Sequence, residues 1–308
     1  MTSPLVQSAE IQAYLDRIAG TADPQGDPRT KAIVRRIVSD LFSTIDEFDV
    51  SAEEFWHALH FLQQAAPEFG LIAPGLGFDH FLDVRMDLQD KAAGIAGGTP
   101  RTIEGPLYVA GAPLSQGFAR LDDGSDKGEV LVMHGTVRET DGTPIAGAIV
   151  DVWHANTLGA YSVFDPGQTA YNNRRRIETD AEGRYRFHSI VPSGYSVPPQ
   201  GSTEQLLGAI GRHGNRPAHI HFFVSAPGHR HLTTQINIPG DPYLHDDFAF
   251  ATHDDLIPDV TRRAEAEAIH AEGLNVPFAE IAFDFRLNRA ESEDETELMA
   301  RARASVDA

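Results

Sequence analysis

Two histidines and two tyrosines are the side chains in this sequence best suited to bind a metal ion. His219 and His221 lie two positions apart in residues 216–223, a segment whose apolar character predicts a strand. Residues two apart on a strand share a face, so both imidazoles can reach one metal ion. Alternatively, both histidines are hydrogen-bonded inside a protein core, and the spacing alone does not separate these alternatives.

Tyr161 and Tyr195 lie in segments expected to be loops, residues 159–165 and 191–198. Taken singly, each tyrosine also fits a packing role with its hydroxyl on a backbone partner. Two phenolates and two imidazoles together would favour an oxygen-loving trivalent ion such as Fe(III). Zinc is less well matched, because the chain has no cysteine and no His-Glu-x-x-His motif.

Composition excludes several other classes of protein. The 308 residues include 45 acidic and 25 basic side chains, giving a net charge of −20. Such a charge argues against a nucleic-acid-binding protein and against docking on an anionic membrane. The N-terminal residues lack a secretory signal pattern, and no apolar run is long enough to span a membrane. The sequence therefore predicts a cytoplasmic protein.

Apolar periodicity divides the chain into a helical and a strand-rich part. Helical spacing predicts short amphipathic helices in residues 1–98, and Gly97-Gly98-Thr99-Pro100 marks a boundary. Residues 99–290 alternate as short strands with turn signals, which predicts an antiparallel β-sandwich. Residues 291–308 form an acidic tail that we expect to be solvated. The strands are expected at 130–137, 149–154, 176–179, 184–190, 218–225, 232–238 and 281–287, with one more helix at 261–269.

Several stretches of the chain resemble the intradiol ring-cleavage dioxygenases. The first three are residues 99–108, residues 151–156 with 159–165, and residues 212–223. The likeness continues through residues 232–237 and 246–249, and it covers most of the chain.

The resemblance implies a non-haem Fe(III), one per chain, held by Tyr161, Tyr195, His219 and His221. The catalytic residues it implies are Arg216, Gln235 and Tyr195, with Tyr195 leaving the metal when substrate binds. The implied fold is an all-β catalytic sandwich preceded by a helical dimerisation domain. A homodimer formed through these helices, with an amphipathic lipid between them, is implied as well.

The activity implied by the resemblance is intradiol cleavage of catechol by dioxygen to cis,cis-muconate, in aromatic degradation through the β-ketoadipate pathway. One alternative is the same chemistry on hydroxyquinol or chlorocatechol. An alternative of another class is a transthyretin-like sandwich that binds a ligand without catalysis.

Matching to the family's pocket segments assigns an apolar substrate wall. The resemblance also implies a difference from the family members that favour hydroxyquinol. Those members have an acidic residue where this chain has Pro74, and Phe where it has Leu107. A buried third hydroxyl would have no partner on proline. We therefore expect catechol to be the preferred ring. The wall comprises Leu71, Pro74, Ile103, Pro106, Leu107, Phe248 and Ala249.

Overall fold

The structure is a computed structural model that describes residues 3–290. The chain divides into two compact units, Met1–Ala66 and Pro67–Ala308. Helices α4 (Phe69–Gly75) and α5 (Phe78–Ala92) belong to the same unit as the strands. The division into a dimerisation and a catalytic domain at residue 98 stays a prediction, and the acidic tail at 291–308 lies outside the described residues.

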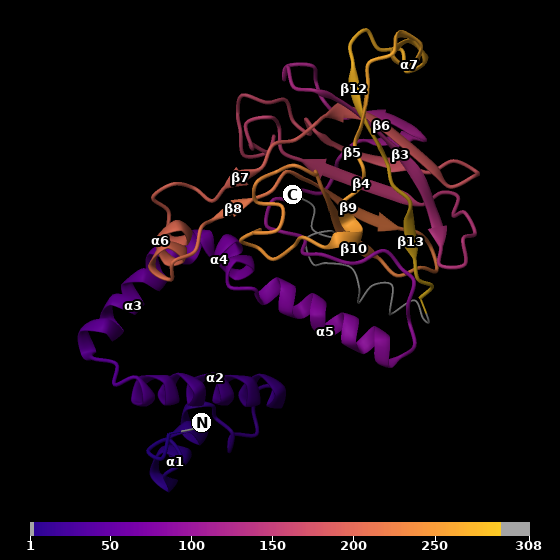
Figure 1. Ribbon diagram of the computed structural model, residues 1–308. Helices are drawn as coiled ribbons and strands as arrows, with labels where there is room; N and C mark the ends of the chain where they lie inside the picture. The colour runs from indigo at the N-terminus through magenta and orange to yellow at the C-terminus, as the bar shows by residue number, and fades with distance from the viewer. Residues whose placement is uncertain (1–2, 291–308) are drawn as a thin grey trace. The chain divides into compact units, whose positions relative to one another are not determined.

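The first unit is helical, as its periodicity predicts (Figure 1). It contains α1 (Ala9–Ile18), α2 (Pro28–Glu47) and α3 (Ala52–Ala65), and a short 3₁₀ turn, η1 (Ala66–Glu68), follows. Ser51 and Glu54 form the capping box at the start of α3 that the sequence indicates. Large apolar side chains stay exposed on these helices in the single chain, among them Ile37, Leu41, Trp56 and Leu62.

The second unit is built mainly from two sheets (Figure 1). One has the strand order β1-β5-β4-β9-β10, and the other has the order β11-β12-β3-β6-β2, with β13 also paired to β3. Strands β7 and β8 form a separate two-stranded ladder. The strands are β1 Leu114–Gln116, β2 Phe118–Arg120, β3 Val130–Glu139, β4 Ile149–His154, β5 Arg174–Glu178, β6 Arg184–Ile190, β7 Tyr195–Ser196, β8 Asn215–Arg216, β9 His219–Ser225, β10 Leu232–Asn237, β11 Thr261–Arg263, β12 Phe278–Ala282 and β13 Phe285–Leu287.

The sheets are mixed rather than purely antiparallel as expected. The central pairings β3–β6, β4–β5, β4–β9 and β9–β10 are antiparallel. Pairings β1–β5, β2–β6, β3–β12 and β3–β13 are parallel. Parallel pairing requires a crossover rather than a tight turn, and long connections supply it here.

Two expected elements are split in the structure. The strand expected at 281–287 is interrupted between β12 and β13, where Tyr185 donates to the Phe283 carbonyl at 2.8 Å and Asp284 accepts from the Thr136 amide at 2.7 Å. Phe283 still donates its amide to the His134 carbonyl of β3 at 2.9 Å, so the chain stays beside β3 across the interruption. The helix expected at 261–269 is instead strand β11 followed by α7 (Ala266–Ala271).

A single hydrophobic cluster draws side chains from both sheets. Strand β9 contributes Ile220, Phe222 and Val224 to this cluster, and β3 contributes Leu131 and Met133. Because side chains alternate along a strand, His219, His221 and Phe223 must lie on the opposite face of β9. The main core therefore fixes the side of the sheet to which both histidines point.

A carboxylate joins the start of helix α6 (Ser202–Ala209) to the segment before α4. Glu68 accepts the backbone amides of Ser202 at 3.0 Å and Thr203 at 2.9 Å, and also the Thr203 hydroxyl at 2.7 Å. Partial burial acts to raise the pKa of Glu68, but these hydrogen bonds outweigh it and lower the pKa. Helix α6 has no cap from its own Gly201, so Glu68 provides it.

We predict that Glu68→Ala lowers stability by about 1 kcal/mol, or about 2–4 °C in Tm. Because folding lowers the pKa of this carboxyl, its contribution is present at neutral pH and is lost as pH falls through the folded-state value. Thermal unfolding of both proteins at pH 7 and near pH 3 measures this difference. Glu182→Ala, in an exposed turn, is the control. An equal Tm deficit at both pH values would contradict the capping role.

Candidate metal centre

The two histidines on β9 lie side by side and are buried. The Nε2 atoms of His219 and His221 are 3.0 Å apart, and the two rings are nearly perpendicular with centroids 4.6 Å apart. The two side chains are almost fully excluded from solvent. The ring edges that carry these nitrogens therefore converge on one point.

Two loops bring the tyrosines to the same point. The Tyr161 hydroxyl oxygen lies 3.4 Å from Nε2 of His219. The Tyr195 ring centroid is 5.6 Å from that of Tyr161 and 5.5 Å from that of His219. Gly159 has a φ of 77°, and a Cβ added there would lie 2.7 Å from the Cβ of Tyr195, so only glycine permits this close approach of the loops.

Different outer contacts hold the two imidazoles. Nδ1 of His219 lies 2.6 Å from the carbonyl oxygen of Pro217, which makes Nδ1 the protonated nitrogen and leaves Nε2 with its lone pair. His221 is instead stacked against Trp153, with centroids 4.9 Å apart and planes 7° apart. Its Nδ1 has no hydrogen-bond partner among the described residues. Both rings are thus fixed with Nε2 directed at the cluster.

Burial favours the neutral form of three of these side chains, His219, His221 and Tyr161. It lowers the pKa of His219 to about 3 and the pKa of His221 well below the usual value. Burial also raises the pKa of Tyr161 well above its usual value, and the neighbouring Tyr195 adds to this effect. Neutral imidazole is the form that binds metals, whereas a phenol must lose its proton to do so.

The donor set fits a ferric ion. Among residues 3–290, no three histidine, cysteine, aspartate or glutamate side chains are grouped to hold a metal. The cluster here instead combines two imidazole nitrogens with two phenol oxygens, of which the oxygens are hard donors once deprotonated. Tyr161, Tyr195, His219 and His221, which the sequence analysis selected, are therefore brought together in the structure.

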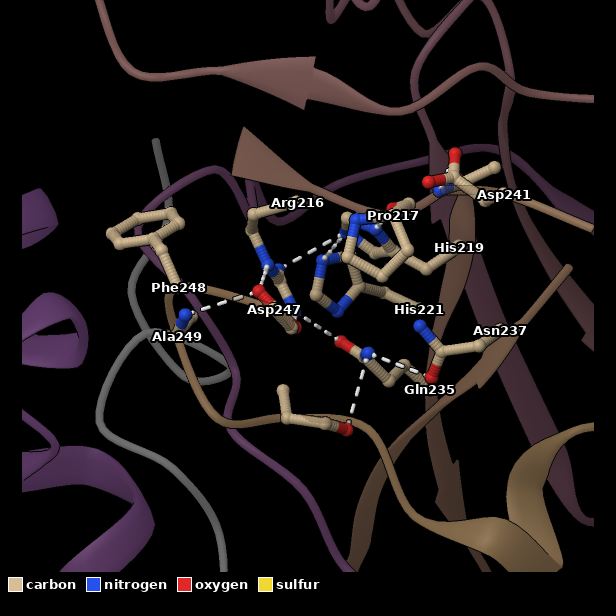
Figure 2. A network of polar contacts seen from close by, with 12 residues as sticks. Arg216, Pro217, His219, His221, Gln235, Asn237, Asp241, Asp247, Phe248 and Ala249 are labelled. Carbon is tan, nitrogen blue, oxygen red and sulfur yellow. Dashed lines mark hydrogen bonds and ion pairs between the residues drawn. The ribbon is translucent and has the colours of Figure 1, made fainter. Parts of the chain in front are cut away.

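Arg216 is a buried cation beside this cluster (Figure 2). Its Nη1 lies 3.1 Å from Nε2 of His219, and its Nη2 donates to Oε1 of Gln235 at 2.8 Å. Asp247 accepts from Nε at 3.1 Å and from Nη2 at 3.0 Å. In the β7–β8 ladder Arg216 is paired with Tyr195, so the ladder holds the cation next to one of the tyrosines.

Asp247 is a site residue to which the sequence analysis gave no role. Burial acts to raise the pKa of Asp247, but Arg216 outweighs this effect and the pKa is lowered. Burial likewise acts to lower the pKa of Arg216. The interactions with Asp247 and the two tyrosines outweigh this effect, so the pKa of Arg216 is raised. The pair is therefore ionised. Its position in residues 246–249, one of the stretches that carries the family resemblance, was the available signal.

Gln235 is fully buried on β10, opposite His221 in the β9–β10 ladder. Its Nε2 donates to the carbonyl of Ala251 at 3.3 Å and to Oδ1 of Asn237 at 3.2 Å, which leaves Oε1 for Arg216 (Figure 2). The amide is thus oriented by its own neighbours. Gln235 in turn fixes the guanidinium.

The expected substrate wall is only partly gathered by the structure. Ile103, Phe248 and Ala249 share one buried hydrophobic cluster, and Leu107 packs against another that contains Tyr161. Leu71 and Pro74 lie on α4, whose last residue Gly75 approaches the ring of Phe248. Pro106 is half-buried. Contact of these seven side chains with a substrate stays a prediction.

Comparison with known proteins gives matches over both parts of the chain. Residues 103–289 match the family described as dioxygenase, and residues 27–94 match the catechol dioxygenase N terminus. A catechol 1,2-dioxygenase of Acinetobacter lwoffii is 65% identical over 83% of this chain and 93% of its own length. That of Acinetobacter baylyi is 50% identical over 99% of this chain and 100% of its own.

A solved structure agrees with these matches. The structure of catechol 1,2-dioxygenase from Acinetobacter sp. ADP1, inhibited by bound mercury, superposes with a TM-score of 0.93 at 50% identity. The likeness covers 98% of each chain. The chain belongs to the intradiol ring-cleavage dioxygenase family, and it is an oxidoreductase. Within that family it is most like the catechol 1,2-dioxygenases. Membership removes the alternative of a ligand-binding sandwich without catalysis.

We predict that Asp247→Asn lowers kcat by about a hundredfold, as expected when a catalytic group is displaced. The substitution leaves the buried Arg216 without its anionic partner, while the tyrosines and histidines stay in place. Metal content should therefore be unchanged. Steady-state oxygen uptake and metal analysis measure the two effects.

Asp246→Asn is the matched control, because Asp246 is the adjacent acid and is exposed, with His213 3.0 Å away. We expect close to unchanged turnover for this variant. Loss of the metal in Asp247→Asn, or equal losses of turnover in both variants, would contradict the assigned role of Asp247.

Proposed function

We propose that this chain cleaves catechol with dioxygen to cis,cis-muconate at one Fe(III) held by Tyr161, Tyr195, His219 and His221. The observation that carries the proposal is the convergence of two phenols and two neutral imidazoles on one buried point. Relatives that are 50% and 65% identical are catechol 1,2-dioxygenases, which supports the same substrate here.

Bound Fe(III) would supply a Lewis acid that binds the deprotonated diol and draws electron density from the ring. Tyr195 is half-buried whereas Tyr161 is almost fully buried, so we assign to Tyr195 the role of the ligand that leaves and accepts a substrate proton. Arg216 places a fixed positive charge where negative charge develops on the ring. Gln235 and Asp247 hold the Arg216 guanidinium in that position.

The proposed substrate wall is apolar: Leu71, Pro74, Ile103, Pro106, Leu107, Phe248 and Ala249. Support comes from the burial of Pro74, Ile103, Phe248 and Ala249 and from the packing of Leu107 near Tyr161. Such a wall offers no partner to a third ring hydroxyl, so we place catechol before hydroxyquinol. Chlorocatechols fit the same chemistry and are the remaining alternative.

The larger assembly is also part of the proposal. The core shared by both sheets supports a β-sandwich as the catalytic domain. The exposed apolar side chains of α2 and α3 support a homodimer formed through the N-terminal helices, with an amphipathic lipid between them. No helix in residues 3–290 is long and apolar enough to cross a membrane. A cytoplasmic location and a role in the β-ketoadipate pathway stay predictions.

We predict unequal effects from the two tyrosines. Tyr161→Phe removes a ligand that stays bound throughout, so iron content and visible absorption should both fall. Tyr195→Phe removes the ligand that leaves, so turnover should fall more than iron content. Metal analysis, visible spectra and oxygen uptake on both variants measure these effects. Equal iron loss, with normal turnover in whichever variant keeps iron, would contradict the two roles.

We predict that kcat/KM is about tenfold to a hundredfold higher on catechol than on hydroxyquinol. This ratio corresponds to the free-energy cost of one unpaired buried hydroxyl. Pro74→Asp should shift this ratio towards hydroxyquinol. The control is Pro67→Asp, because Pro67 is an exposed proline within η1. Oxygen uptake with product identification provides the test. A muconate product supports the proposed function, whereas a ring-opened semialdehyde contradicts it. Higher efficiency of the unmodified protein on hydroxyquinol would show that the wall is misassigned.

A further inference from the structure

Arg174 is a buried cation that forms no ion pair with any residue in 3–290. It begins β5, is 1% exposed, and is among the largest fully buried side chains. Its Nη2 donates to the carbonyl of Leu107 at 2.8 Å, but its Nε and Nη1 have no hydrogen-bond partner among the described residues. A guanidinium in this state is costly to bury unless an anion compensates it.

The carboxylate nearest in the fold is engaged elsewhere. Asp151 lies on the neighbouring strand β4 and accepts the Tyr108 hydroxyl at 2.8 Å. In the β4–β5 ladder Asp151 is opposite Arg176, whereas Arg174 is opposite Trp153. No hydrogen bond joins Asp151 to Arg174 in the described part of the chain. Burial lowers the pKa of Arg174, and the nearby charges, that of Asp151 among them, offset this effect only in part.

Tyr161 is the group that Arg174 faces. The guanidinium carbon lies over the Tyr161 ring, 5.6 Å from its centroid, within the range of a cation–π contact. A phenolate would attract this cation far more strongly than a neutral ring does, because the site is buried and weakly screened. No arginine lies over the Tyr195 ring in the described residues, although Arg216 is paired with Tyr195 in the β7–β8 ladder.

We infer that Arg174 is the counter-ion of the Tyr161 phenolate: it stabilises this metal ligand as an anion and so keeps Tyr161 on the metal while Tyr195 leaves. The inference rests on the proposed iron centre. Arg174 contacts a ligand rather than the substrate, so it is a positioning residue. A Tyr161 phenolate on the metal would supply a facing anion to the guanidinium, whose Nε and Nη1 have no hydrogen-bond partner among the described residues.

The test compares Arg174→Met with Arg175→Met. Both variants lose one positive charge from the same strand, but Arg175 points to the other face of β5 and donates to the carbonyl of Arg120. Three quantities are measured for each: the wavelength of the visible absorption band of the iron-loaded protein, the dissociation constant for iron, and the Tm of the metal-free protein.

For Arg174→Met we expect the band to move to longer wavelength, because a phenolate without its counter-ion gives up electron density more easily. Two opposite charges about 6 Å apart at an effective dielectric constant of about 20 correspond to roughly a hundredfold weaker iron binding. The metal-free Tm should not fall, since the variant removes a buried cation whose desolvation is only partly compensated. Arg174→Lys keeps the charge, so its band position and iron affinity should lie between those of Arg174→Met and those of the unmodified protein. Arg175→Met should match the unmodified protein in band and affinity.

An unchanged band and affinity in Arg174→Met, with a lower metal-free Tm, would overturn the inference and make Arg174 a purely structural residue. Equal shifts in Arg174→Met and Arg175→Met would overturn it as well. If Arg174→Met does not fold, Arg174→Gln is measured against the same expectations. An unmodified protein that binds iron without a visible band contradicts the proposed metal centre itself, whereas a normal band that is insensitive to residue 174 contradicts this inference alone.

Discussion

The alternation of side chains along β9 is the constraint on which the centre depends. Ile220, Phe222 and Val224 are buried in the core shared by both sheets, so His219 and His221 must face the other way. A slip of one residue in the register would turn both histidines into the core and expose the core residues. The hydrophobic free energy that stabilises the sheets therefore also fixes the direction of the two imidazoles.

Burial then determines the chemistry of the side chains that meet there. Exclusion of water lowers the pKa of His219 and His221 and raises the pKa of Tyr161, so all three side chains favour their neutral forms. The same exclusion makes fixed charges effective, because they are poorly screened. Arg216 is stabilised by Asp247 and oriented by Gln235, while Arg174 lies over Tyr161. Two buried cations thus lie beside the tyrosines that we propose as metal ligands.

Local patterns predicted much of this structure. Alternation and turn signals predicted strands 149–154 and 184–190 with the bounds that are observed. The alternation of β9 and the two tyrosine-containing loops made the four side chains candidates, and the family resemblance assigned them as metal ligands. Substrate contacts and the dimer did not follow from periodicity and came only from the family resemblance.

What the sequence could not predict depends on contacts between distant residues. Local patterns do not indicate helix α4, since Pro74 lies inside it and proline usually ends a helix. The break between β12 and β13 depends on a hydrogen bond from Tyr185, almost a hundred residues away. Trp153 lies in a buried hydrophobic cluster, and its stacking on His221 depends on the pairing of β4 with β9. Asp247 and Arg174 likewise acquire their roles only when separate strands and loops meet.

The central claim is that two tyrosines and two histidines form one ferric site. Its most direct test is metal analysis of the purified protein combined with its visible spectrum before and after removal of the metal. The account predicts one Fe(III) per chain and a broad visible band, arising from charge transfer from tyrosinate, that disappears with the iron and returns on reconstitution. Stoichiometric zinc, or an iron-loaded protein without colour, would contradict the account.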